Sequence, residues 1–146
     1  MGFDTFSKLF ETGVLPILEY GSEIWGFKFY KCTDGIQERA IRFFLGLHKF
    51  TPIPALRGEI GWVSTQHRRW ACMIHFWNRL LKKHIHSLAY KIFQLDLAQA
   101  NDSSNWSSEL KAVLSNVQME YLFDSRSVWD LEMFKQRCNG CYQQEY

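Results

Sequence analysis

The strongest periodic pattern of apolar and polar positions lies between residues 64 and 83. Ser64 is a residue type that caps helix N-termini, and the pattern after it has a helical period. One side of the helical wheel is apolar, with Trp70, Met73, Ile74, Trp77, Leu80 and Leu81. The other side carries Arg68, Cys72, His75, Arg79, Lys82 and Lys83. The spacing predicts an amphipathic helix to about Lys83, with an aromatic face for packing and a basic stripe for solvent or phosphate.

Two helical segments are predicted before this helix. Residues 3–27 carry apolar side chains at helical spacing. Pro16 either kinks this segment or begins a new helix, because proline lacks an amide donor and clashes with the preceding turn. The next helix is expected to begin at Thr33 or Asp34, with Gln37 placed to complete a capping box with Asp34. Its apolar residues fall on two strips, so we expect it to be buried on most sides.

Three further helices are predicted after the amphipathic helix, each behind a residue suited to the N-cap: Ser87, Asn105 and Ser127. Residues 48–62 form a connector with a possible short helix around residues 55–59. No segment alternates with a period of two, so strands are not expected. The predicted fold is all-α, an irregular bundle of about five to seven helices.

The chain divides into residues 1–47 as one set of helices, residues 48–62 as the connector and residues 63–146 as a C-terminal helical region. We expect these parts to form one compact unit, because 146 residues suit a single domain or one compact piece of a larger protein. The apolar faces predict a core that includes Phe43, Phe44, Trp70, Ile74, Trp77, Leu81, Ile92 and Leu114.

Composition supports a folded chain without a membrane span. Apolar residues make up 47% and aromatic residues 16%, which is ample for a core and argues against disorder. No apolar stretch is long enough to cross a bilayer, and the start lacks the basic and apolar regions of a signal peptide. We therefore expect an intracellular chain, nuclear or cytoplasmic, with reduced cysteines.

Basic charge is concentrated in the middle of the chain. Residues 28–91 hold twelve Lys or Arg against three acidic residues, although the net charge of the whole chain is only +2. Such a block is typical of a nucleic-acid contact surface, and equally of an ordinary solvated face. The candidate nucleic-acid-binding residues are Arg39, Arg42, Lys49, Arg68, Arg69, Arg79, Lys82 and Lys83.

Several ordered blocks carry a family resemblance. Residues 14–26 read VLPILEYGSEIWG and residues 36–47 read IQERAIRFFLGL. They are followed by Gly61-Trp62, Arg69-Trp70, Trp77-Asn78-Arg79-Leu80 and Asn105-Trp106-Ser107-Ser108. Together these blocks resemble the thumb and C-terminal region of LINE-type (non-LTR retrotransposon) reverse transcriptases, over most of residues 8–130.

The resemblance implies a non-catalytic fragment rather than an enzyme. The family's polymerase holds two metal ions on palm aspartates, including those of a Tyr-x-Asp-Asp turn. This sequence has neither that turn nor any adjacent acidic pair, so no catalytic residue, metal or cofactor is expected. For a thumb, the family implies sequence-independent contact with the backbone of an RNA or DNA duplex. Two alternatives remain open: a helical module that binds a protein partner or itself through exposed apolar surface, and a truncated element without function.

Each of the other motifs has a structural interpretation as well as a functional one. Cys138 and Cys141 have the spacing of half a zinc site, with the His84-x-His86 pair as a possible other half, or they are free thiols. Cys72 and His75, three residues apart on a helix, suit a nucleophile and its base, or are an incidental pair on a polar face. The six tryptophans suit base stacking, but their positions favour core packing.

Overall fold

The computed structural model describes residues 2–52, 57, 60–102 and 104–144, with side chains as far as residue 138. This part of the chain is helical and contains no strand, so the all-α prediction is confirmed. The elements are α1 (Phe3–Leu9), the π-helical turn η1 (Phe10–Val14), α2 (Leu15–Leu18), α3 (Ser22–Trp25), α4 (Lys31–Leu45), α6 (Thr65–Leu81), α7 (Leu88–Ala98), α8 (Trp106–Asn116), α9 (Tyr121–Ser125) and α10 (Leu131–Gln144). The short helix expected around residues 55–59 lies largely outside the described residues.

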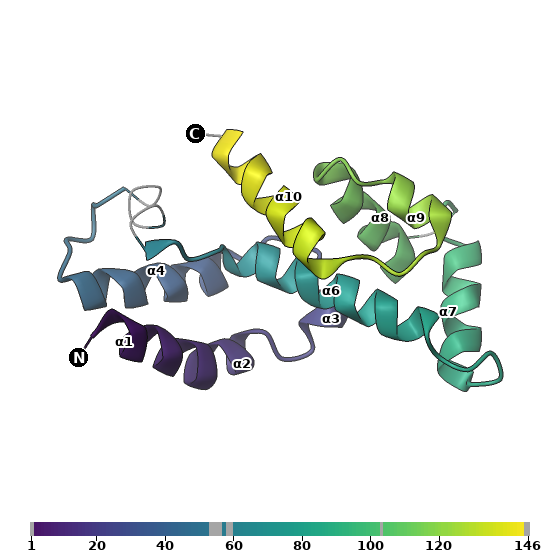
Figure 1. Cartoon of the computed structure of the whole chain (residues 1–146), viewed down its shortest axis with the longest axis horizontal. Coiled ribbons are helices and arrows are strands. Elements are labelled where there is room, and N and C mark those ends of the chain that lie inside the picture. Colours follow the sequence, from purple (N-terminus) through teal and green to yellow (C-terminus); the bar gives the residue numbers. More distant parts are fainter. Residues whose placement is uncertain (1, 53–56, 58–59, 103, 145–146) are drawn as a thin grey trace.

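Helix α6 runs through the middle of the molecule and contacts α3, α4, α7 and α10 (Figure 1). Helices α3 and α4 pack against it from the N-terminal side of the chain, and α7 and α10 from the C-terminal side. Helices α1, α2 and α4 lie side by side at one end, whereas α7, α8 and α9 gather at the other. The amphipathic helix predicted first from the sequence is therefore the element that joins the two ends.

Three of the predicted N-caps are confirmed. The hydroxyls of Ser64 and Ser87 accept hydrogen bonds from the amides three residues further on, at 3.3 and 3.2 Å. Asn105 Oδ1 accepts the Ser108 amide at 2.9 Å, and Ser108 Oγ accepts the Asn105 amide at 2.9 Å, which completes a capping box. These caps satisfy amides that have no partner within their own helices, so the starts of α6, α7 and α8 are readable from the sequence.

Two other predicted helix starts are wrong. Helix α4 begins at Lys31 rather than at Thr33 or Asp34, and the Asp34 carboxylate is used by another helix. The last helix begins at Leu131, beyond Ser127, and the Asp130 carboxylate accepts the Glu132 amide at 2.9 Å. The structure also contains α9, which the pattern did not predict. At α4 the expected cap, Asp34, is engaged by a tertiary contact with Thr65, whereas at α10 another local cap, Asp130, takes the place of Ser127.

The turn between α2 and α3 and the exit from α3 both require glycine. Gly21 has a φ of 67°, in the left-handed region that disfavours side chains. A Cβ at Gly26 would lie 2.9 Å from Arg69 Cβ and closer still to the Ser22 carbonyl. These two glycines let α3 lie directly on α6.

The C-terminal half of the chain contains a continuous apolar core around Trp77. This indole is fully buried and stacks on Trp129 with 4.8 Å between ring centroids, while Phe93 packs edge-on at 5.2 Å. Asn78 fixes the incoming segment: its Nδ2 donates to the Trp129 carbonyl and its Oδ1 accepts the Trp129 amide, both at 2.9 Å. The segment before α10 is therefore held to α6 by both packing and hydrogen bonds.

The N-terminal half is held together by an aromatic stack rather than by an aliphatic core. Phe6 lies 4.5 Å from Phe44 and 5.9 Å from Trp62 between ring centroids, and Phe10 lies 4.8 Å from Trp62. The Trp62 indole donates to Ser7 Oγ at 3.1 Å. This stack ties α1 and η1 to α4 and to the segment before α6.

The predicted core is confirmed in part. Trp70, Ile74, Trp77 and Leu114 are buried, and Phe44 and Leu81 are partly buried. Phe43 and Ile92 were predicted wrongly, because 84% and 56% of their surfaces are exposed. The expectation that α4 is buried on most sides is also wrong: its buried face is Thr33, Asp34, Gln37 and Ile41. That face is mainly polar, so hydrophobicity alone selected the wrong side of the helix.

Candidate nucleic-acid interface

Arg69 lies in the interior of the protein and cannot reach a phosphate there. The prediction that it binds nucleic acid is therefore wrong. It is fully buried, and Nη1 donates to Thr33 Oγ1 at 2.7 Å and to Thr65 Oγ1 at 2.9 Å. Its guanidinium carbon lies 5.8 Å from the centroid of the Trp25 ring and 5.5 Å from that of Tyr30. Hydroxyls and aromatic faces therefore replace water around this cation.

Electrostatics and helical spacing account for the position of Arg69. Burial lowers the pKa of its guanidinium, and the nearby carboxylates of Asp34 and Glu19 oppose that shift. In the sequence, Arg69 stands four residues before Met73 and eight before Trp77, so all three share one helix face. This spacing was the signal that Arg69 belongs to the inner side of α6.

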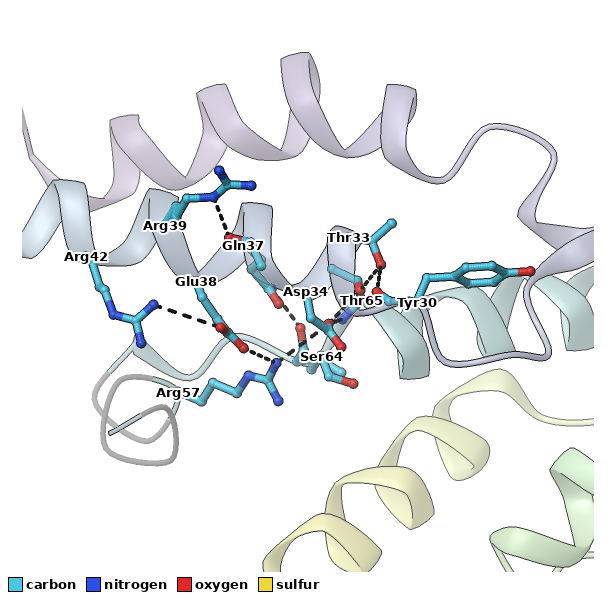
Figure 2. A network of polar contacts seen from close by, with 12 residues as sticks. Tyr30, Thr33, Asp34, Gln37, Glu38, Arg39, Arg42, Arg57, Ser64 and Thr65 are labelled. Atoms are coloured by element: carbon cyan, nitrogen blue, oxygen red, sulfur yellow. Dashed lines mark hydrogen bonds and ion pairs between the residues drawn. The ribbon is translucent and has the colours of Figure 1, made fainter. Parts of the chain in front are cut away.

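Asp34 links α4 to the start of α6. Its Oδ1 accepts the Thr65 amide at 3.2 Å and the Thr65 hydroxyl at 2.7 Å, as Figure 2 shows. Arg57 Nη2 lies 3.6 Å from Asp34 Oδ1 and 3.4 Å from Glu38 Oε1. A carboxylate of one helix thus caps another helix and balances cations brought by α6 and by the connector.

Arg42 is drawn into the same network. Its Nη1 lies 3.9 Å from Glu38 Oε2 (Figure 2). Its Nη2 donates to the Thr51 carbonyl at 3.2 Å. The side chain is only 18% exposed. Arg42 therefore holds the end of α4 to the segment after it, and contact with a phosphate would require it to leave these partners.

Two Arg residues of α6 face Glu19, which follows the end of α2, and Glu23 of α3. Arg68 Nε donates to Glu19 Oε1 at 3.1 Å, and both side chains are partly buried. Arg79 Nη2 lies 4.0 Å from Glu23 Oε1, and this pair is more exposed. Arg68 is consequently engaged, whereas Arg79 keeps most of its guanidinium in solvent.

The remaining candidates are exposed. Arg39 donates to the Gly35 carbonyl of its own helix at 3.1 Å, and Lys49 Nζ lies 5.0 Å from the centroid of the Phe50 ring. Lys82 and Lys83 follow the last turn of α6 and are exposed, with no ion-pair partner among the described residues. The structure thus divides the eight candidates into a buried one, two engaged ones and five that face solvent.

A basic segment extends beyond the two lysines into the link between α6 and α7. His84 and His86 are exposed there, and His84 Nδ1 accepts the His86 amide at 3.2 Å. We call Arg79, Lys82, Lys83, His84 and His86 the basic junction. In the sequence the two histidines were candidates only as metal ligands, although the basic run KKHIH at residues 82–86 indicates the same cluster.

A cleft of about 620 Å³ lies between α6, α10 and the α2–α3 segment. Cys72 and His75 line it together with Glu19 and Glu23. Burial raises the pKa of the Cys72 thiol, and Ser22 beside it opposes the shift only in part. The thiol is therefore protonated at neutral pH, which is the opposite of what a nucleophile requires.

Among the described residues, no group of three or more His, Cys, Asp or Glu side chains is arranged to hold a metal ion. Cys138 is buried against the C-terminal core, whereas the side chain of Cys141 lies outside the described part. Within the same part, no helix combines the length and the apolar character that crossing a bilayer requires.

All six tryptophans donate their indole N–H within the protein. The acceptors are the Tyr20 carbonyl for Trp25, Ser7 Oγ for Trp62, the Phe27 carbonyl for Trp70, the Ser127 carbonyl for Trp77, the Glu23 carbonyl for Trp106 and the Leu122 carbonyl for Trp129. The indoles join helices, which agrees with the core interpretation rather than with base stacking.

Comparison of the chain with protein-family models, curated proteins and solved structures gives no match.

Proposed function

We propose that this chain is a non-catalytic, thumb-like part of a LINE-type reverse transcriptase, and that it binds the phosphate backbone of a nucleic-acid duplex through the basic junction. The observation that supports the proposal is the exposure of this cluster. Lys82 and Lys83 have no ion-pair partner in the described part of the chain, and the closest acidic contact of Arg79 is 4.0 Å long. Cations that remain in solvent can exchange their counterions for phosphate, and that release drives binding.

Helix stability alone does not account for the basic junction. Cations in the last turn of a helix gain about 0.3–1 kcal/mol from the helix dipole, and this gain falls off within that turn. Arg79 and Lys82 lie within reach of the end of α6, but His84 and His86 lie beyond it. A cluster that continues past the helix end fits a phosphate-contacting surface better than a capping role.

Binding of this kind is sequence-independent and sensitive to salt. Each phosphate neutralised on B-form DNA contributes about −0.9 to the slope of log K against log salt. If Arg79, Lys82 and Lys83 each meet one phosphate, the slope is about −3. Arg42, Arg68 and Arg69 add nothing to this slope while they keep their internal partners.

The test is fluorescence anisotropy with labelled RNA–DNA duplexes of two unrelated sequences, over a series from about 50 to 200 mM salt. The double variant Lys82→Gln/Lys83→Gln is expected to weaken binding to both sequences equally and to reduce the slope by about 2. The matched control is Lys135→Gln/Arg137→Gln, which removes the same charge from exposed positions on α10. Binding that is unaffected by salt, or that the control weakens as much as the junction variant, would contradict the proposal.

A further inference from the structure

Helix α7 has apolar residues on two opposite sides, and only one of them is packed. Phe93 and Leu97 point into the C-terminal core, with 3% and 7% of their surfaces exposed. On the other side, Leu88, Ile92 and Leu95 are 73%, 56% and 65% exposed. A helix that is apolar all round is normally covered all round, so the outer face lacks a partner.

The exposed residues follow the spacing of a helix-pairing seam. Within α7, Leu88, Ile92 and Leu95 are separated by four and then three residues. Ile85 is also exposed, but it lies in the turn before the extended N-cap Ser87, so it adds apolar surface next to the helix and does not continue its spacing. Alternation of three and four residues is what lets one helix pack lengthwise on another. We call these four residues the α7 seam. Helix α7 stands at the end of the molecule away from α1 and α4, where a second molecule can approach it (Figure 1).

We propose that two copies of this chain pair through the α7 seam, with the two α7 helices antiparallel about a two-fold axis near Tyr90. In this arrangement Leu88 meets the partner's Ile92, and Leu95 lies toward the turn of the partner that carries Ile85. The register is self-complementary because the contact between positions 88 and 92 centres on position 90, as a two-fold interface requires.

Charge favours a second copy and sets the antiparallel direction. The chain entering α7 carries exposed Lys82 and Lys83, whereas the loop after α7 carries exposed Asp102. Asp96, in the last turn of α7, does not contribute to this charge pattern, because its carboxylate accepts hydrogen bonds from the amide and hydroxyl of Ser107 in α8. Antiparallel pairing places the basic end of each copy beside the acidic end of the other. Parallel pairing would bring the two lysine pairs together and would also align the two helix dipoles.

The size of the seam agrees with a reversible dimer. Its four aliphatic side chains are each more than half exposed, and together they supply roughly half of the about 800 Å² that each partner buries in a standard interface. The flanking polar residues of α7 would supply the rest as a rim. We therefore expect an equilibrium between monomer and dimer that depends on concentration.

Sedimentation velocity of the full chain over a concentration series, without nucleic acid, tests the pairing. The unchanged protein is expected to shift from monomer to dimer, and Leu88→Lys is expected to remain monomeric. The control is Ile17→Lys on α2, since Ile17 is 77% exposed and lies outside the seam. The proposal is overturned if the unchanged protein stays monomeric throughout, or if Ile17→Lys abolishes the dimer and Leu88→Lys does not. Because no nucleic acid is present, the result is independent of the proposed function.

Cross-linking tests the direction. Leu88→Cys and Ile92→Cys proteins of different tag length are mixed under oxidising conditions, each in a Cys32→Ser background because Cys32 is exposed. Antiparallel pairing predicts mostly mixed cross-links between position 88 of one protein and position 92 of the other. The background without an added cysteine should give few cross-links. If Leu88→Cys cross-links mainly with itself, the two helices are parallel and the proposed arrangement is wrong.

Discussion

The two halves of this protein are held together by different forces. In the C-terminal half, the buried apolar side chains between positions 70 and 138 form one continuous cluster. In the N-terminal half, the buried apolar side chains of the described residues are Phe10, Leu15 and Ile41, whereas much of the interior is polar. Apolar burial is non-directional, but a buried polar network works only if each member keeps its partners. The N-terminal half therefore depends on individual contacts, and the C-terminal half depends on total burial.

Helix α6 takes part in both kinds of interior. Its first turns supply Thr65 and Arg69 to the polar network, and its later turns supply Met73, Ile74 and Trp77 to the apolar core. Helix α6 thus fixes the position of the N-terminal half relative to the C-terminal half. A destabilising substitution in either half should therefore first increase local unfolding in that half. Unfolding should extend to the other half only when α6 itself unfolds.

The largest effect is expected from Trp77→Ala. The change removes a fully buried indole that stacks on Trp129 and packs edge-on with Phe93, so it should lower the free energy of unfolding by about 3–5 kcal/mol. Urea denaturation followed by circular dichroism measures the change. Tyr20→Ala is the control, because Tyr20 is 85% exposed and its removal should cost less than about 0.5 kcal/mol. If the two variants lost the same free energy of unfolding, apolar burial around Trp77 would not be what stabilises the C-terminal half.

The second effect, in the N-terminal half, is expected from Asp34→Ala. This change leaves Arg57 without one of its carboxylates and the Thr65 amide without its cap, at a cost of about 3 kcal/mol. Hydrogen exchange should become faster in α4 and at the start of α6 while α8 stays protected. Asp34→Asn keeps an acceptor oxygen but removes the charge, and it should recover part of the loss. The exposed Asp124→Ala serves as the control, and faster exchange in α8 as well would argue against separate halves.

The same contrast explains how much of the structure could be predicted from the sequence. The buried face of α6 was readable because its apolar residues repeat at helical spacing. The buried face of α4 was not, because Asp34 and Gln37 find their partners in Thr65 and the Val63 carbonyl, far along the chain. For α7 the pattern predicted the helix but selected the wrong one of its two apolar faces, because Ile92 is exposed and Phe93 is buried.

The candidate interface could be predicted only in part for the same reason. A count of basic residues does not distinguish a cation in solvent from one with an internal partner. Arg68 meets Glu19 across 49 positions of the sequence, and such a pair leaves no local signal. Lys82 and Lys83 were easier to place, because a run of basic residues after the end of an amphipathic helix has few ways of becoming buried.

A third, smaller effect is expected at two neighbouring positions of α4. Phe44 stacks with Phe6 and is partly buried, so Phe44→Ala should lower the free energy of unfolding by about 1–3 kcal/mol. Phe43 is 84% exposed, and Phe43→Ala should change stability by less than about 0.5 kcal/mol. Thermal unfolding of the two variants in parallel makes the comparison. A greater loss for Phe43 than for Phe44 would mean that the aromatic stack does not hold the N-terminal half.

The smallest effect is expected at Glu19, where burial raises the carboxyl pKa although Arg68 lies within hydrogen-bonding distance. A raised pKa means that the folded protein binds this proton more tightly than the unfolded chain does. The contribution of Glu19 to stability is therefore fully present below the usual carboxyl pKa of 4.5 and is lost as the pH rises through the higher folded value.

At neutral pH the charged Glu19 should thus contribute little or nothing, despite its ion pair. Glu19→Gln is expected to leave stability within about 1 kcal/mol of the unchanged protein at pH 7, or slightly above it. Any gain over the unchanged protein should disappear near pH 4, where Glu19 itself becomes neutral. Urea denaturation at both pH values measures this. A large loss at pH 7 that vanishes in acid would show instead that the Arg68–Glu19 pair stabilises the N-terminal half, as a buried apolar residue does in the C-terminal half.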